Sequence, residues 1–150
     1  LSGLSPAGSW DVAKICLYGQ SSKFGGGDIV LTKGYQGNPV VTGNWATHLA
    51  TEGEISRRAI ADWVQNVYLV FTLNSAGDLW VAEKLGNILK ICVRQSYDYE
   101  DDEAGATNGG AGGGTGNFSI PYPASPEISP KLVLENFTIS KPKSRAFILA

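Results

Sequence analysis

The hydrophobic residues of this chain are grouped in short runs, which glycine, proline and polar residues separate. Such runs are typical of β-strands, because the side chains of a strand alternate between two faces and turns end each strand. The pattern predicts strands at 12–18, 28–33, 40–45, 67–73, 79–83, 88–94 and 131–139. A brief run at 118–122 and an apolar end at 145–150, either a strand or a docked tail, complete the set.

Two of these runs carry more specific predictions. The run at 67–73 is the longest unbroken apolar stretch, so we expect a strand that is buried on both faces. In the run at 88–94, we expect Leu89, Ile91 and Val93 to share one face. Residues 74–77 contain polar residues and a glycine and are expected to form the turn after the buried strand.

One stretch shows helical spacing between the strands. Its apolar residues recur at intervals that place them on one face of a helix: Ile55, Ala59, Ile60 and Trp63. Thr51 and Glu54 precede it and fit a capping box. The pattern as a whole predicts an all-β fold, a two-sheet β-sandwich of the jelly-roll type with one short inserted helix.

Length and composition favour one domain over residues 1–150. Residues 1–9 are small and polar and are expected to be an arm or linker, and residues 97–117 to be an acidic, Gly-rich surface loop. The formal net charge of −2 does not indicate a nucleic-acid or membrane binder, and no apolar run is long enough to cross a membrane. The chain has no methionine, so we expect a product cut from a polyprotein or a trimmed domain.

The residues that could carry chemistry are few. His48 is the only histidine, and no nucleophile motif accompanies it, so we expect no enzyme and no catalytic residue. Cys16 and Cys92 lie in similar strand patterns and are expected to be reduced thiols, with a disulfide as the alternative. No metal or cofactor is expected, although the acidic run at 98–103 leaves calcium binding open.

Aromatic residues leave a second function open, which is a carbohydrate-binding or receptor-binding β-sandwich module. The candidates for a platform on which a sugar could stack are Trp10, Trp45, Trp63, Trp80, Tyr97 and Tyr99. Aromatic residues of this kind are more often part of a core or its rim. A mild basic bias near the C-terminus is a weak signal for RNA: Lys131, Lys141, Lys143 and Arg145.

Several motifs between residues 43 and 96 resemble those of a known family. They are Gly43-Asn44-Trp45, then Ile55 and Arg58, then Ala61-Asp62-Trp63, the apolar run 67–73, and Arg94-Gln95-Ser96 at the end of a strand. In this order and spacing they resemble the small coat proteins of comovirus-type, picorna-like plant viruses with icosahedral shells. The resemblance covers residues 28 to 99.

That resemblance implies a structural capsid protein with a viral jelly-roll fold, cut from a polyprotein and located in the virion. It implies assembly with other coat-protein subunits, as a homo- or hetero-oligomer, into a shell around genomic RNA. The residues that it marks as structural or interface candidates are Trp45, Ile55, Arg58 and Trp63.

Overall fold

The computed structural model describes residues 8–21, 26–35, 53–100 and 127–139. The predicted strands at 40–45, 118–122 and 145–150 lie outside these residues, as do Trp45, His48 and most of the predicted arm and acidic loop.

The described residues form eight strands and three short helical segments. In chain order they are β1 (Gly8–Ser9), β2 (Val12–Tyr18), β3 (Asp28–Lys33), β4 (Glu54–Ala59), the 3-10 helix η1 (Ile60–Asp62), β5 (Tyr68–Thr72), α2 (Ser75–Lys84), β6 (Ile91–Gln95), α3 (Ser96–Tyr99), β7 (Lys131–Glu135) and β8 (Thr138–Ile139).

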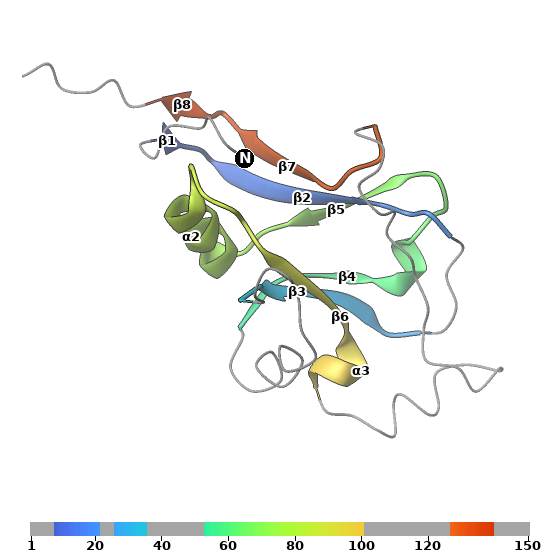
Figure 1. Ribbon diagram of the computed structural model, residues 1–150. Coiled ribbons are helices and arrows are strands. Elements are labelled where there is room, and N and C mark those ends of the chain that lie inside the picture. Colours follow the sequence, from blue (N-terminus) through green and yellow to red (C-terminus); the bar gives the residue numbers. More distant parts are fainter. Residues whose placement is uncertain (1–7, 22–25, 36–52, 101–126, 140–150) are drawn as a thin grey trace, which may run out of the picture.

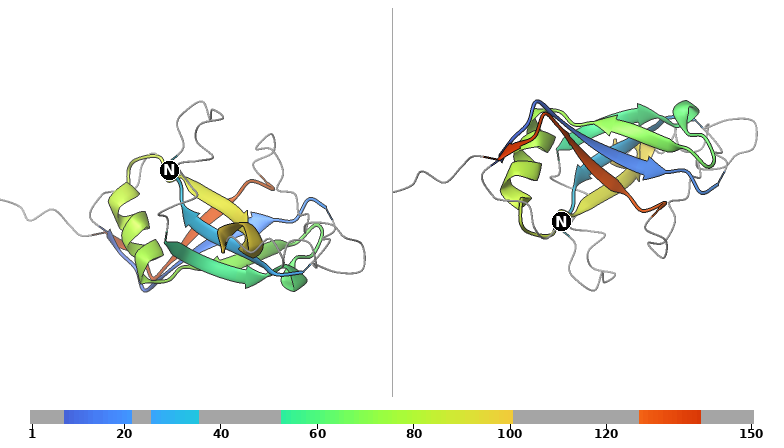
Figure 2. Two further views of the ribbon diagram at one scale, coloured as in Figure 1. Left: turned by 90° about the horizontal axis from the view of Figure 1, so that it is seen from below. Right: turned by 90° about the horizontal axis from the view of Figure 1, so that it is seen from above.

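Two antiparallel three-stranded sheets make up the body of the protein, in the orders β5-β2-β7 and β4-β3-β6. Figure 1 shows them as an upper and a lower layer, with α2 at one end between them. The views from below and above confirm this position of α2 (Figure 2). The predicted all-β class and two-sheet arrangement are therefore confirmed. The short strands β1 and β8 form a further pair beyond the first sheet.

The connections between strands follow one nested order. β3 pairs with the next strand, β4, and β2 pairs with the strand after that, β5. β6 then lies on the other side of β3, and β7 on the other side of β2. As a result Ile15 in the middle of β2 lies opposite Phe71 on one side and Leu132 on the other.

The core lies between the two sheets and contains apolar side chains from both. Its buried members are Ala13, Ile15, Leu17, Ile29, Leu31, Ile55, Ile60, Trp63, Leu69, Phe71, Leu73, Val81 and Leu85. Because the inward residues alternate with outward ones along β2 and β5, these strands obey the predicted period of two.

The sandwich is closed on the side where β4 meets β5. Ser56 Oγ donates a hydrogen bond to the Thr72 carbonyl at 2.7 Å, and the Asn74 backbone N–H donates to the Ile55 carbonyl at 2.9 Å. Asn74 Nδ2 also donates to the Glu54 carbonyl at 2.8 Å. On the opposite side, no described strand covers the outer edges of β6 and β7.

The predicted helix around residues 55–63 is wrong. Glu54–Ala59 is strand β4, and only Ile60–Asp62 is helical, as a single 3-10 turn. Antiparallel pairing with β3 holds this segment in an extended conformation, and the register of the pairing shifts between Leu31 and Thr32. Ile55, Ile60 and Trp63 are nevertheless all buried, because a strand followed by a tight turn brings the same residues to the core.

The predicted strand at 79–83, and the turn before it, are replaced by helix α2. Asn74 is its N-cap, with Oδ1 accepting a hydrogen bond from the Gly77 N–H at 3.0 Å. The alternation that suggested a strand fails because Trp80 and Val81, which are adjacent, are both buried, while Leu79 is 65% exposed. With 3.6 residues per turn, Gly77, Trp80 and Val81 lie on one face of the helix and are buried together, which alternation does not explain.

Three further boundaries differ from the prediction. The run at 67–73 is buried on one face only, since Val70 of β5 is exposed. The run at 88–94 becomes strand only at Ile91. The run at 131–139 is divided into β7 and β8 at Asn136, whose backbone φ of 53° interrupts a regular strand. In addition, the predicted loop at 97–117 begins within helix α3.

Candidate functional site: the open side of the sandwich

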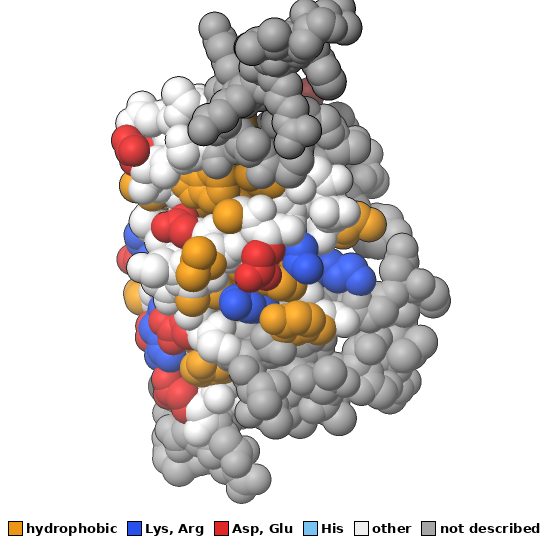
Figure 3. All heavy atoms as spheres, turned by 90° about the vertical axis from the view of Figure 1, so that its left-hand side faces the viewer, with side chains coloured by type: hydrophobic (Ala, Val, Ile, Leu, Met, Phe, Trp, Pro, Cys, Tyr) orange, Lys and Arg blue, Asp and Glu red, His pale blue; other side chains and the backbone are white. Residues whose placement is uncertain are grey.

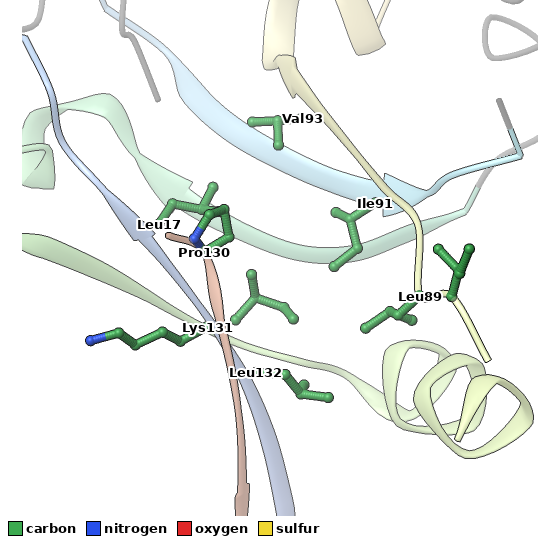
Figure 4. Close-up of a pocket in the computed structure, with 9 residues that line it drawn as sticks. Leu17, Leu89, Ile91, Val93, Pro130, Lys131 and Leu132 are labelled. Atoms are coloured by element: carbon green, nitrogen blue, oxygen red, sulfur yellow. The ribbon is translucent and has the colours of Figure 1, made fainter. Parts of the chain in front are cut away.

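An apolar cavity of about 360 Å³ opens between β6 and β7. It is lined by Ile15, Leu17, Ile88, Leu89, Ile91, Val93, Pro130, Lys131 and Leu132. These side chains come from β2, β6 and β7 and from the segments just before β6 and β7. Figure 4 shows that Lys131 extends away from the others. The lining is therefore apolar except for one lysine that points out of it.

The cavity follows from the strand pattern. β2 is the middle strand of its sheet, so its inward residues Ile15 and Leu17 are covered and only 4% and 3% exposed. The inward residues of the two edge strands, such as Ile91 and Leu132, are only partly buried. The predicted sharing of one face by Leu89, Ile91 and Val93 is confirmed, because all three line the cavity. An apolar surface that the fold leaves half covered is a candidate contact surface.

Strand β7 forms one rim of this cavity and, among the described strands, is an edge of its sheet. Its outward side chains have mixed chemistry. Val133 is 40% exposed, the Lys131 ammonium lies 4.2 Å from the centre of the Tyr68 ring, and Glu135 forms an ion pair with Lys14. Edge strands present unpaired backbone groups that can pair with another strand, so β7 can accept one.

The candidate residues from the sequence do not meet at one surface. Ile55 and Trp63 are 0% and 2% exposed, and Trp63 Nε1 donates a hydrogen bond to the Ser21 carbonyl at 2.9 Å. Gly19 lies against the Trp63 ring, where a Cβ atom would come within 3.2 Å of it. Arg58 is exposed and pairs with Asp62 at 2.8 Å. Trp45 lies outside the described residues.

Two arginines bind acidic residues at the α3 end of the second sheet. Arg57 contacts Glu54 at 2.8 Å, Glu100 at 2.7 Å and Asp28 at 3.3 Å, and these hydrogen bonds, that of Glu54 above all, raise the pKa of the guanidinium. Arg94 is 6% exposed and pairs with Asp98 at 2.8 Å. The sequence pattern gave no signal for this network.

These ion pairs involve Asp98 and Glu100, the first acidic residues of the run at 98–103 for which calcium binding was left open. Within the described ranges, no group of three or more residues of the types that hold a metal comes together. Residues 101–103 of the run lie outside those ranges, as does His48.

The two cysteines lie in different sheets, Cys16 on β2 and Cys92 on β6, and they do not form a disulfide. The alternative of a disulfide between them is therefore not supported by the fold. Burial raises the pKa of the Cys16 thiol, and the nearby Lys131 and Lys14 only partly offset that effect.

Two of the tryptophans proposed for a sugar-binding platform are not available at the surface, and Trp45 lies outside the described residues. Trp63 and Trp80 are buried, and Trp80 Nε1 donates a hydrogen bond to the Lys90 carbonyl at 3.2 Å. The ammonium groups of Lys33 and Lys84 lie 5.5 Å and 4.4 Å from the Trp80 ring. On the face shown in Figure 3, hydrophobic, basic and acidic side chains are interspersed. This face has no broad single-charge patch among the described residues.

No helix in the described ranges is long and apolar enough to cross a membrane. Comparisons with protein-family models, with curated proteins and with solved structures found no match to this chain. The arguments for a function therefore rest on strand order, on the open side and on the sequence motifs.

Proposed function

We propose that this chain is a structural capsid subunit with a jelly-roll fold, which assembles with other coat-protein subunits into the icosahedral shell of an RNA virus. Its place is then the virion, where the enclosed genomic RNA is a weaker partner. Its role is packing between subunits and not catalysis. The observation that carries the proposal is the order of the strands.

A jelly roll is a long antiparallel hairpin of eight strands that is rolled up into two sheets. The hairpin pairs the third strand with the sixth and the fourth with the fifth. Rolling then places the eighth strand beside the third and the seventh beside the fourth. If β2 to β7 are the third to eighth strands, all four pairs are present: β2–β5, β3–β4, β2–β7 and β3–β6.

The closed and open sides also fit such a roll. The fifth and sixth strands lie at the side where the two sheets meet, which here is the junction of β4 and β5. The first and second strands have their positions beside the eighth and seventh, which are the outer edges of β7 and β6. The apolar cavity lies between those two edges.

Jelly rolls also occur in lectins and cupins, so strand order alone does not select a capsid. The motifs between Gly43 and Ser96 support the capsid family, and the described part of the interior has no cluster of polar groups of the kind that an enzyme site needs. Among the described residues, the open side is apolar and bounded by two edge strands, which suits contacts between polypeptides better than contacts with a small polar ligand.

The test is assembly. The chain is expressed with the other coat-protein segments of its precursor, and the material is examined by electron microscopy and analytical ultracentrifugation. We expect shell-like particles that contain this chain in stoichiometric amounts. Particles that form without it, or a chain that stays monomeric with its partners present and binds a glycan array instead, would contradict the proposal.

A further inference from the structure

Two lysine ammonium groups lie over one tryptophan ring at the α2 end of the molecule. Lys33 Nζ, from the end of β3, is 5.5 Å from the centre of the Trp80 ring, and Lys84 Nζ, from the last turn of α2, is 4.4 Å from it. The ring of Tyr35, a residue that is 49% exposed, extends this aromatic surface, with its centre 5.1 Å from that of Trp80. A single ligand can therefore contact both ammonium groups, which we call the lysine pair.

Hydrogen bonds hold the tryptophan that carries the lysine pair. Trp80 is 4% exposed, and its Nε1 donates to the Lys90 carbonyl at 3.2 Å. The Gly34 backbone N–H donates to the same carbonyl at 3.0 Å. These bonds join α2, the end of β3 and the segment before β6. The two lysines thus share a fixed support, and a fixed site loses less entropy when a ligand binds.

The lysine pair has no acidic partner among the described residues, because none of the ion pairs found there includes Lys33 or Lys84. By contrast, Arg57, Arg58 and Arg94 all pair with carboxylates. Two ammonium groups on one ring repel each other, and the negative face of the ring offsets this repulsion only in part. An anionic ligand that contacts both groups removes the repulsion, so the site favours an anion.

We propose that the lysine pair binds the acidic run at 98–103 of a second copy of this chain. Five of the six residues in that run carry a carboxylate: Asp98, Glu100, Asp101, Asp102 and Glu103. In its own chain Asp98 pairs with Arg94, and Glu100 pairs with Arg57. Figure 1 shows the start of the run, in α3, beneath the second sheet, whereas α2 lies between the two sheets. The described acids of the run are therefore held away from the lysine pair of the same copy, which favours a contact between copies.

The surroundings of the lysine pair favour an acidic peptide over a nucleic acid. A nucleic acid is held by a basic surface that follows several phosphates along its backbone. Here the same helix that carries Lys84 also carries Asp78 and Glu83. Figure 3 views this end of the molecule and shows basic, acidic and hydrophobic side chains side by side. A site of two lysines next to carboxylates suits a short acidic segment and would repel a long polyanion.

Each copy contributes its lysine pair to one neighbour and its acidic run to another. Such a contact is heterologous, so it continues from copy to copy and closes into a ring where the rotation allows it. The inference deepens the proposed assembly function and rests on it only for the expectation that copies of this chain meet. Failure of each can be distinguished. A chain that enters shells but does not bind the run refutes the inference alone, and a chain that binds the run but never enters shells refutes the proposed function alone.

The first experiment titrates a fluorescein-labelled peptide of residues 96–104 with the 150-residue chain at low ionic strength and follows fluorescence polarisation. We expect saturable binding that weakens as salt is added. Lys33→Ala and Lys84→Ala should each weaken it roughly 3- to 5-fold, and the double variant roughly 10- to 25-fold. Lys131→Ala is the matched control, because it also removes an ammonium group from an aromatic ring, that of Tyr68 at 4.2 Å, and should leave binding unchanged.

The second experiment tests whether the contact joins two copies. A carbodiimide links an amine to a carboxylate that it touches, and a mixture of unlabelled and isotope-labelled chains separates links between copies from links within one. We expect mixed-label links from Lys33 or Lys84 to the run. Links within single copies only would overturn the inference, as would a peptide that does not bind the wild type or binds equally well with amides in place of its carboxylates. A single-stranded oligouridylate that binds the lysine pair more tightly than the peptide would also overturn it. Circular dichroism of each variant verifies folding.

Discussion

Replacing Asn74 by alanine tests the junction that joins the two sheets to α2. The Asn74 side chain makes two hydrogen bonds: Oδ1 accepts from the Gly77 N–H at 3.0 Å, and Nδ2 donates to the Glu54 carbonyl at 2.8 Å. The first caps the helix and the second holds the end of β4. The backbone N–H of residue 74 also donates to the Ile55 carbonyl, and this bond survives in alanine.

The expected loss follows from these two bonds. An N-cap replaced by alanine loses about 1 kcal/mol, and an exposed side-chain hydrogen bond contributes about 0.5–1.5 kcal/mol. We therefore expect Asn74→Ala to lower the free energy of unfolding by about 2 kcal/mol. For a chain of this size that corresponds to a fall in Tm of about 4–8 °C. Asn74→Asp keeps the capping oxygen and loses only the donor, so its fall should be about half as large.

Thermal and urea unfolding, followed by circular dichroism and tryptophan fluorescence, measure these changes. Asn87→Ala is the matched control, since Asn87 is exposed beyond the end of α2 and its side chain should contribute less than about 0.5 kcal/mol. If Asn74→Ala is as stable as Asn87→Ala, the capping argument is refuted. If Asn74→Asp is as unstable as Asn74→Ala, the capping oxygen contributes nothing and the loss belongs to the contact with β4 alone.

Three further predictions test the core, the thiols and the surface. Phe71→Ala removes a fully buried core side chain and should lower the free energy of unfolding by about 3–5 kcal/mol in urea titrations. Leu132→Ala, at the open side, should lower it by only about 1–2 kcal/mol. Equal losses would mean that the open side is as well covered as the core. A thiol reagent at pH 8 should modify Cys92 faster than Cys16, whose pKa burial raises, and Cys92→Ser should leave only the slow phase. Arg58→Ala breaks one exposed ion pair and should shift stability by less than about 0.5 kcal/mol in the same titrations.

The strands of the first sheet could be predicted from the sequence because their side chains alternate between a core and an outer face. β2 in the middle of this sheet matches its predicted range, and so does β3 in the middle of the second sheet. For β5 the unbroken apolar run predicted burial on both faces, but Val70 points outward and is exposed although it is apolar. Apolar character alone therefore overstates how many faces of a strand are covered.

Strand β4 of the second sheet and helix α2 could not be predicted in the same way, because distant contacts decide them. Ile55, Ile60 and Trp63 have helical spacing, yet pairing of the preceding residues with β3 makes most of that segment a strand. Conversely, Leu79 and Val81 alternate as in a strand, while the Asn74 side chain starts a helix. In the first segment the apolar residues of the pattern are buried by a strand where a helix was predicted, whereas in α2 Leu79 is exposed and the adjacent Trp80 and Val81 are buried.

The open side shows the same limit. The sequence predicts that Leu89, Ile91 and Val93 share a face, and they do. That this face meets Leu132 across a cavity depends on β6 and β7 lying on the far sides of β3 and β2, which no local pattern reveals. Candidate residues chosen from motifs therefore fell in the core, at Ile55 and Trp63, while the surface available for contacts is made by edge strands.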